Sequence, residues 1–129
     1  MTASAPSAAP QPAVLDAKAL ANLRELDPTG RGGLVKRIMQ TFDATLVRML
    51  GEIETALAQS DWTALGHIAH TLKSSSSSIG ALDLARHCVE VERLVREGHG
   101  AQTAPLVPAW TAEMRRVRVA VKSLAESPA

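Results

Sequence analysis

The sequence predicts an all-α protein, an antiparallel four-helix bundle with a short extra N-terminal helix. Of its 129 residues, 46% are hydrophobic but only 2% are aromatic, and alanine and leucine outnumber β-branched residues. This composition favours helices over sheets. Four segments repeat apolar residues at spacings of three and four, and short polar or glycine-containing loops separate them. Because short loops make neighbouring helices antiparallel, these segments predict one compact bundle.

The two ends of the chain differ from the middle in composition. Residues 1–14 are mostly Ala, Pro and Ser, and such a segment buries too little apolar surface to offset its loss of conformational entropy. We therefore predict a disordered tail or linker over 1–14, the helical bundle over 15–125 and a frayed C-terminus over 126–129.

The first two predicted helices are separated by a turn. Asp16 can cap a short helix, and Asp27-Pro28-Thr29-Gly30 is a turn signal after it. A long helix is expected from about Leu34 to Gln59. Its apolar stripe consists of Leu34, Ile38, Phe42, Leu46, Met49, Ile53 and Leu57.

Three further helices complete the predicted bundle. After Ser60-Asp61, a helix runs to Gly80 with Leu65, Ile68, Ala69, Leu72, Ser76 and Ile79 on its inward side. The next helix spans about 81–96, with Ala81, Leu84, Cys88, Val91 and Val95 inward. The last is expected over 103–125, where Pro108 predicts an irregular start or a kink.

Composition also narrows the classes of function. Fourteen basic and thirteen acidic residues leave a net charge of +1, so no basic field favours a nucleic-acid partner. No apolar run approaches the ~20 residues of a membrane span, and the N-terminus does not resemble a secretion signal. The single cysteine, Cys88, cannot form an intramolecular disulfide, which fits a reducing, cytoplasmic location.

His70 is the strongest candidate for chemistry. On a helical wheel it falls on the side opposite the apolar stripe, with Lys73 one turn further on. Small residues share this outward sector, namely Thr63, Gly66, Ser74 and Ser77. A neutral imidazole is nucleophilic, and a nearby ammonium stabilises an arriving phosphoryl group, so the arrangement suits phosphoryl transfer to histidine.

The sequence from His70 to Ala81, HTLKSSSSSIGA, resembles the signature of histidine-containing phosphotransfer (HPt) domains, roughly H-x-L-K-G-S-S-(A/S)-x-(L/I)-G-A. Leu84, Cys88 and Glu92 also resemble the family pattern, and the resemblance covers about residues 15–125. One position departs, since Ser74 stands where the family usually has glycine. Because serine is also small, we expect partner docking to be retained.

The resemblance implies a phosphorelay intermediate without a kinase core of its own. His70 would accept a phosphoryl group from the aspartyl phosphate of a response-regulator receiver domain and pass it to another receiver aspartate. Lys73 would stabilise the phosphoryl group, while Gly66, Ser74, Ser77 and Thr63 would form the docking surface. We expect no bound cofactor or metal, Mg²⁺ in the partner receiver, a hybrid sensor kinase as a further partner, no membrane insertion and a monomer.

Other interpretations of the same residues remain open. The chain could be a non-catalytic helical adaptor, or a phosphoacceptor domain of the chemotaxis-kinase type. His67 lies three residues before His70, a spacing compatible with metal ligation, but no further ligand stands at an obvious spacing in that helix. Cys88 lies on an inward stripe and is interpreted as an inert core thiol. Ser75 and Ser76 are both expected to face the interior.

Overall fold

The computed structural model describes residues 14–126, and every regular element in that range is helical. The elements are α2 (Ala17–Glu25), α3 (Leu34–Ala58), α4 (Trp62–Ile79), α5 (Leu82–Arg96), the 3₁₀ helix η1 (Gly100–Leu106) and α6 (Val107–Glu126). The expected all-α class is therefore confirmed. Most of the predicted N-terminal tail, and residues 127–129 of the predicted frayed end, lie outside the described residues, whereas Glu126 still belongs to α6.

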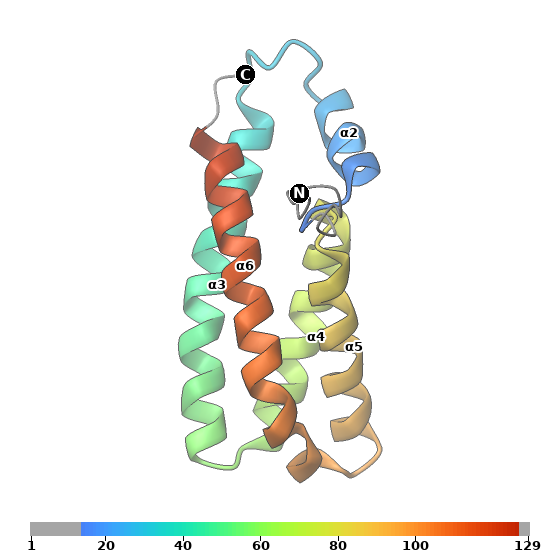
Figure 1. The fold of residues 1–129 in the computed structure, drawn as a ribbon, viewed down its shortest axis with the longest axis vertical. Helices are drawn as coiled ribbons and strands as arrows, with labels where there is room; N and C mark the ends of the chain where they lie inside the picture. Colours follow the sequence, from blue (N-terminus) through green and yellow to red (C-terminus); the bar gives the residue numbers. More distant parts are fainter. Residues whose placement is uncertain (1–13, 127–129) are drawn as a thin grey trace, which may run out of the picture.

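The four long helices form an elongated bundle (Figure 1). α3 packs most extensively on α6, and α4 on α5, so the bundle consists of two helix pairs. The short helix α2 contacts α4 at the end of the bundle opposite η1 (Figure 1). None of the helices within residues 14–126 combines the length and apolar character needed to cross a membrane.

The core lies between the two helix pairs and follows the predicted apolar stripes. In α3 the buried residues recur every three or four positions, at Met39, Phe42, Leu46, Met49, Ile53 and Ala56. α6 contributes Trp110, which is fully buried, together with Met114, Val117 and Val121. Because α3 and α6 bury residues in such stripes, helical periodicity was sufficient to identify most of this core.

Both ends of α4 are fixed by hydrogen bonds to backbone groups. At its start, the Asp61 carboxylate accepts a hydrogen bond from the Ala64 backbone N–H at 3.1 Å. At its end, Gly80 adopts a left-handed conformation with φ of 87°, and its carbonyl accepts a hydrogen bond from the Asp16 N–H at 2.8 Å. A Cβ atom on Gly80 would lie only 2.8 Å from the Asp16 nitrogen. Gly80 therefore ends α4, and its lack of a side chain lets Asp16, just before α2, approach the end of that helix.

The start of the last helix differs from the prediction. Residues 103–106 belong to η1 rather than to α6, which begins at Val107. The prolines explain the difference, since a helix that began at Thr103 would need a backbone N–H donor at Pro108. With α6 starting at Val107, Pro108 falls in the first turn, where no such donor is required. The predicted irregular start is thus confirmed, but the boundary was four residues too early.

Candidate functional site

His70 lies near the middle of α4 and projects away from the core. Its side chain is 64% exposed, while the adjacent Ala69 is fully buried. A position in the middle of a capped helix fixes the backbone on both sides of the ring. The structure therefore places the imidazole outward, as the helical wheel predicted.

One carboxylate of the neighbouring helix contacts both residues of the predicted reactive pair. Glu92 of α5 places Oε2 at 2.5 Å from His70 Nδ1, and its Oε1 accepts a hydrogen bond from Lys73 Nζ at 2.6 Å. The Glu92 side chain is only 17% exposed and that of Lys73 34%. Glu92 thus connects the predicted nucleophile and the predicted cation across the α4–α5 interface.

The ionisation of Glu92 determines which His70 nitrogen is available. Hydrogen bonds from Lys73 and then from His70 hold the pKa of the Glu92 carboxyl below its usual value, against the opposing effect of burial. An ionised carboxylate can only accept hydrogen bonds, so His70 Nδ1 must carry a proton. In the neutral ring, Nε2 then holds the free lone pair on the exposed imidazole.

Three of the four residues predicted to surround His70 are on the surface. Thr63, Ser74 and Ser77 are exposed on α4, as the helical wheel predicted. Their part in docking stays a prediction. Lys73 lies one turn from His70, as expected, and its ammonium is engaged by Glu92.

The fourth residue, Gly66, was placed wrongly. It is buried, and a Cβ atom added to it would lie 2.8 Å from Val95 Cγ1 and 3.0 Å from Val95 Cβ. The helical wheel considered only the stripe that faces the centre of the bundle, but α4 also packs closely on α5. Gly66 therefore permits close approach of α4 and α5 and is not part of an exposed docking surface.

A shallow hollow lies between α4 and α5 beside Lys73. Its side chains come from both helices, and the α5 side is largely apolar. Leu82 and Val89 are 42% and 49% exposed there. The lining residues are Lys73, Ser74, Ser77, Ser78, Leu82, Ala85, Arg86 and Val89.

The other three histidines and the serines next to His70 differ in their exposure. His67 and His99 are exposed, and His87 is half-buried. Within residues 14–126 no three His, Cys, Asp or Glu side chains are grouped so that they could hold a metal ion. Ser76 is buried as predicted, but Ser75 is exposed, which corrects the expectation that both face the interior.

Cys88 is a buried free thiol. Its burial raises the pKa of the thiol to about 12, which keeps it protonated at neutral pH. The position therefore agrees with the interpretation of Cys88 as a core residue.

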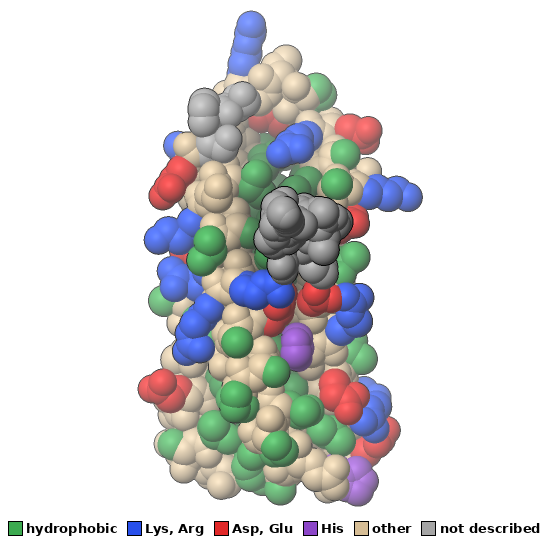
Figure 2. All heavy atoms as spheres, viewed as in Figure 1, with side chains coloured by type: hydrophobic (Ala, Val, Ile, Leu, Met, Phe, Trp, Pro, Cys, Tyr) green, Lys and Arg blue, Asp and Glu red, His purple; other side chains and the backbone are tan. Residues whose placement is uncertain are grey.

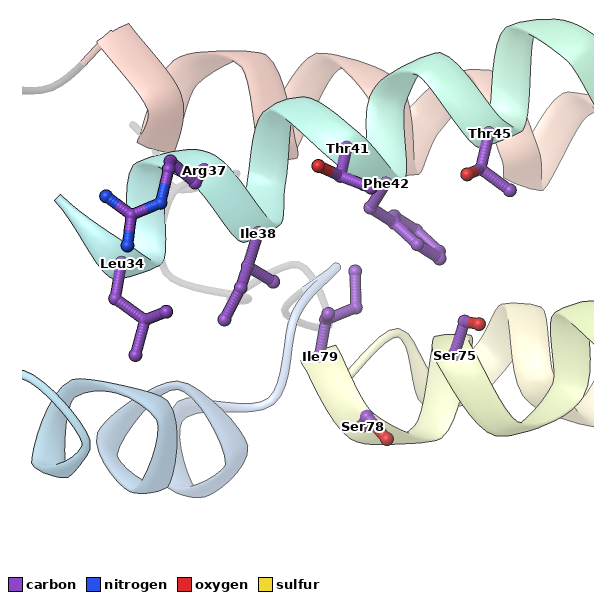
Figure 3. A pocket seen from close by; sticks show the side chains of 9 residues that line it. All are labelled: Leu34, Arg37, Ile38, Thr41, Phe42, Thr45, Ser75, Ser78 and Ile79. Atoms are coloured by element: carbon purple, nitrogen blue, oxygen red, sulfur yellow. The ribbon is translucent and has the colours of Figure 1, made fainter.

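A second hollow lies between α3 and the C-terminal part of α4 (Figure 3). Ile38 and Phe42 project from α3 toward α4, where Ile79 faces them, and Leu34 also lines the hollow (Figure 3). None of the predicted site residues lines this hollow. This hollow is therefore separate from the predicted site residues.

The importance of Glu92 could have been inferred from its place in the sequence. Glu92 follows Leu84 and Cys88 at intervals of four, so it shares a helix face with two fully buried residues. A carboxylate in such a place needs a partner. The identity of those partners, His70 and Lys73, required the structure, because they lie on another helix.

Comparison with known proteins gives the same class as the site geometry. A sequence model of the Hpt domain matches residues 37–120. Among solved structures, the chain is similar to histidine-containing phosphotransfer protein B (HptB) from Pseudomonas aeruginosa PAO1, with 32% sequence identity and a TM-score of 0.77. That match covers 90% of this chain and 97% of HptB. A search of curated protein sequences finds no match.

A helical bundle that exposes one anchored histidine is the architecture of a histidine phosphotransfer protein. The chain belongs to the Hpt domain family. It is a phosphorelay intermediate of two-component signalling, and proteins of this family work with response-regulator receiver domains.

Proposed function

We propose that His70 is the phosphoacceptor of this relay protein and reacts at Nε2. The observation that carries the proposal is the contact at the opposite ring nitrogen. Nδ1 is held by Glu92 at 2.5 Å, while the ring as a whole is 64% exposed. An incoming phosphoryl group therefore has access to an Nε2 lone pair on a ring that is already oriented.

The proposed step moves one phosphoryl group and no proton. The Nε2 lone pair forms an N–P bond, and the P–O bond to the aspartyl carboxyl of the donor receiver breaks. The aspartate leaves as a carboxylate with the electron pair, and the ring keeps its Nδ1 proton and becomes positively charged. Reversal of this step on a second receiver returns the phosphoryl group to an aspartate. Mg²⁺ would be supplied by the receiver and would neutralise phosphoryl charge there.

Lys73 would stabilise the phosphoryl group on His70. It lies one turn away on the same helix, and its side chain is 34% exposed, so we expect its ammonium to reach a phosphoryl group bound to His70. Charge-assisted hydrogen bonds from an ammonium to phosphoryl oxygens are stronger than neutral ones. No other cofactor is needed by the proposed step.

The receiver would dock on the α4–α5 face around His70. Thr63, Ser74 and Ser77 provide small side chains there, and the hollow beside them presents Leu82 and Val89 to a partner. We define this docking surface by those five residues. Exposed apolar side chains next to a reactive group fit an apolar partner surface.

Charge plays a smaller part in this proposal than apolar contact. The net charge is +1, and Figure 2 shows basic and acidic side chains interspersed over one face of the bundle. We therefore propose that the protein docks receivers, including the receiver of a hybrid sensor kinase, through weakly charged contacts. We also propose that it is a monomer in the cytoplasm.

The experiment is transfer from a purified receiver carrying ³²P-aspartyl phosphate in the presence of Mg²⁺. The wild-type chain should acquire acid-labile, alkali-stable label, and His70→Gln should acquire none. His67→Gln is the matched control, because His67 is also exposed on α4 and lies one turn earlier. It should be labelled as fast as the wild type.

Two other results would lead to different functions. If no receiver of a broad panel labels the wild type, the chain is an adaptor that retains the fold without the reaction. If a kinase domain with ATP labels His70 but no receiver exchanges with it, the chain is a phosphoacceptor of the chemotaxis-kinase type.

A further inference from the structure

We propose that a hollow between α5 and α6 is a binding site for an alkylammonium group, with Glu113 as its main ligand. The side chains that line this hollow come from both helices, and all of them are charged or titratable. They are Asp83, Arg86, His87, Glu90, Glu113 and Arg116. None of the proposed phosphotransfer residues lines it, so ligand binding there does not depend on the proposed function.

Glu113 is the only charged residue among the buried residues of the range 14–126. Its side chain is 8% exposed. Oε1 accepts one hydrogen bond, from Arg116 Nη1 at 3.2 Å, whereas the buried Oε2 has no hydrogen-bond partner among the described residues. Removing a carboxylate from water is costly unless its oxygens are paired. Glu113 therefore lines the hollow with an acceptor that the protein itself leaves unpaired.

Glu92 shows how a carboxylate between two helices is fully paired in this protein. It is 17% exposed, and each of its oxygens has a partner within 2.6 Å. Glu113 is more deeply buried, yet its one hydrogen bond is longer and comes from a guanidinium whose side chain is 49% exposed. Because Arg116 can return to water, a better donor can displace it from Glu113. The unequal pairing points to a further cationic donor at Glu113.

The other carboxylates of the hollow already have partners. Arg86 forms an ion pair with Asp83. Both oxygens of Glu90 accept hydrogen bonds from Arg93, which does not line the hollow. These pairs are formed within α5, so a ligand does not need to break them in order to bind Glu113.

His87 lines the same hollow from α5, and its half-buried side chain supplies a second acceptor. A neutral imidazole offers one nitrogen lone pair, and a carboxylate can only accept hydrogen bonds. An ammonium group has three donors and no acceptor, and its compact charge can bond to groups on two helices. Since residues 14–126 contain no three side chains grouped to hold a metal ion, we assign the hollow to an organic cation.

The test is an NMR titration of the ¹⁵N-labelled full chain with 1,4-diaminobutane at pH 8, where alkylammonium groups are protonated. Shift changes should saturate and should concentrate in residues 83–90 and 113–116. The expected dissociation constant is about 1–10 mM, as befits so small a ligand. Butane-1,4-diol has the same length without the charge and should cause no such changes. Equal changes with the diol, or diamine changes that do not saturate at this hollow, would overturn the proposal.

Two pairs of variants separate the site from general attraction between charges. Glu113→Gln should bind the diamine about 10- to 100-fold more weakly, because one charge-assisted hydrogen bond is lost. Glu97→Gln removes the same charge from α5 outside the hollow and should bind as the wild type does. Arg116→Met should bind more tightly, because the competing guanidinium is gone, whereas Arg115→Met should leave the affinity unchanged.

Wild-type affinity in Glu113→Gln, or equal affinities in the two arginine variants, would contradict the assignment. If Glu113→Gln does not fold, as judged by circular dichroism, the two arginine variants decide. A parallel titration with Nα-acetyl-lysine amide identifies the source of the ammonium group. Binding of the diamine alone assigns the site to a free amine, and binding of both shows that a partner's lysine also fits. Binding of neither would refute the site.

Discussion

At Gly66, α4 and α5 lie so close together that Val95 leaves no room for a side chain. A Cβ atom on Gly66 would lie 2.8 Å from Val95 Cγ1 and 3.0 Å from Val95 Cβ, and the latter atom is held close to the α5 backbone. In Gly66→Ala, the helices would therefore have to move apart. Overpacking of this kind typically costs about 1–3 kcal/mol.

Helix propensity acts in the opposite direction. The sign of the change in the free energy of unfolding therefore shows whether overpacking or helix propensity is the larger effect. Replacing a glycine inside a helix by alanine usually stabilises by about 1 kcal/mol. The net effect of Gly66→Ala should thus be a loss of about 0–2 kcal/mol in the free energy of unfolding. Gly51 is the matched control because it lies inside α3 with no atom within 4 Å of an added Cβ, so Gly51→Ala should stabilise by about 1 kcal/mol.

Urea unfolding followed by circular dichroism measures both variants, and a double-mutant cycle isolates the contact. In a Val95→Ala background the close approach to Cγ1 is removed while that to Cβ at 3.0 Å remains, so Gly66→Ala should destabilise the protein less than it does in the wild-type background. The reasoning would be refuted if Gly66→Ala stabilised the wild-type background as much as Gly51→Ala does. It would also be refuted by a coupling energy of zero with Val95.

Glu92, Cys88 and Asp61 each have a contact or a degree of burial that can be tested separately. Since the pKa of Glu92 is lowered by Lys73 and His70, its contribution to stability is present at neutral pH and is lost as the pH falls below the ordinary value of 4.5. The stability difference between wild type and Glu92→Gln, measured by urea titration at several pH values, should therefore shrink toward pH 3, and a constant difference would contradict the pairing. Cys88, with a pKa of about 12, should resist alkylation by iodoacetamide at pH 8 in the folded protein and react after unfolding, so rapid modification of the native state would exclude its burial. Asp61→Ala removes the N-cap of α4 and should cost about 1 kcal/mol in thermal unfolding, while an unchanged Tm would show that the cap contributes nothing.

Helical periodicity was sufficient for the fold and for the outward placement of His70. The stripe from Met39 to Ile53 in α3 is buried at intervals of three and four, and the residues after Gly80 begin a new helix. These features are local, since an amphipathic stripe and a left-handed glycine act within one or two turns of the chain. Residues separated by one turn of α4, such as His70 and Lys73, could therefore be placed together from the sequence.

Contacts between helices were the part that periodicity could not supply. Gly66 was assigned to the surface because a single stripe was taken as the whole buried side of α4, although α5 packs against a second side. For the same reason the sequence could not reveal that Glu92 bridges His70 and Lys73. Its position on a buried stripe indicated that it needs a partner, but the partner depends on how two helices are rotated relative to each other.

The site of phosphorylation can be located to a single ring nitrogen. After transfer from a phosphorylated receiver, ³¹P and ¹⁵N NMR of the labelled protein identify both the residue and the ring nitrogen that carry phosphorus. The geometry at Glu92 predicts one N–P bond, at Nε2 of His70, with the proton retained at Nδ1. Phosphorus on another residue such as His67, or at Nδ1 of His70, would contradict it.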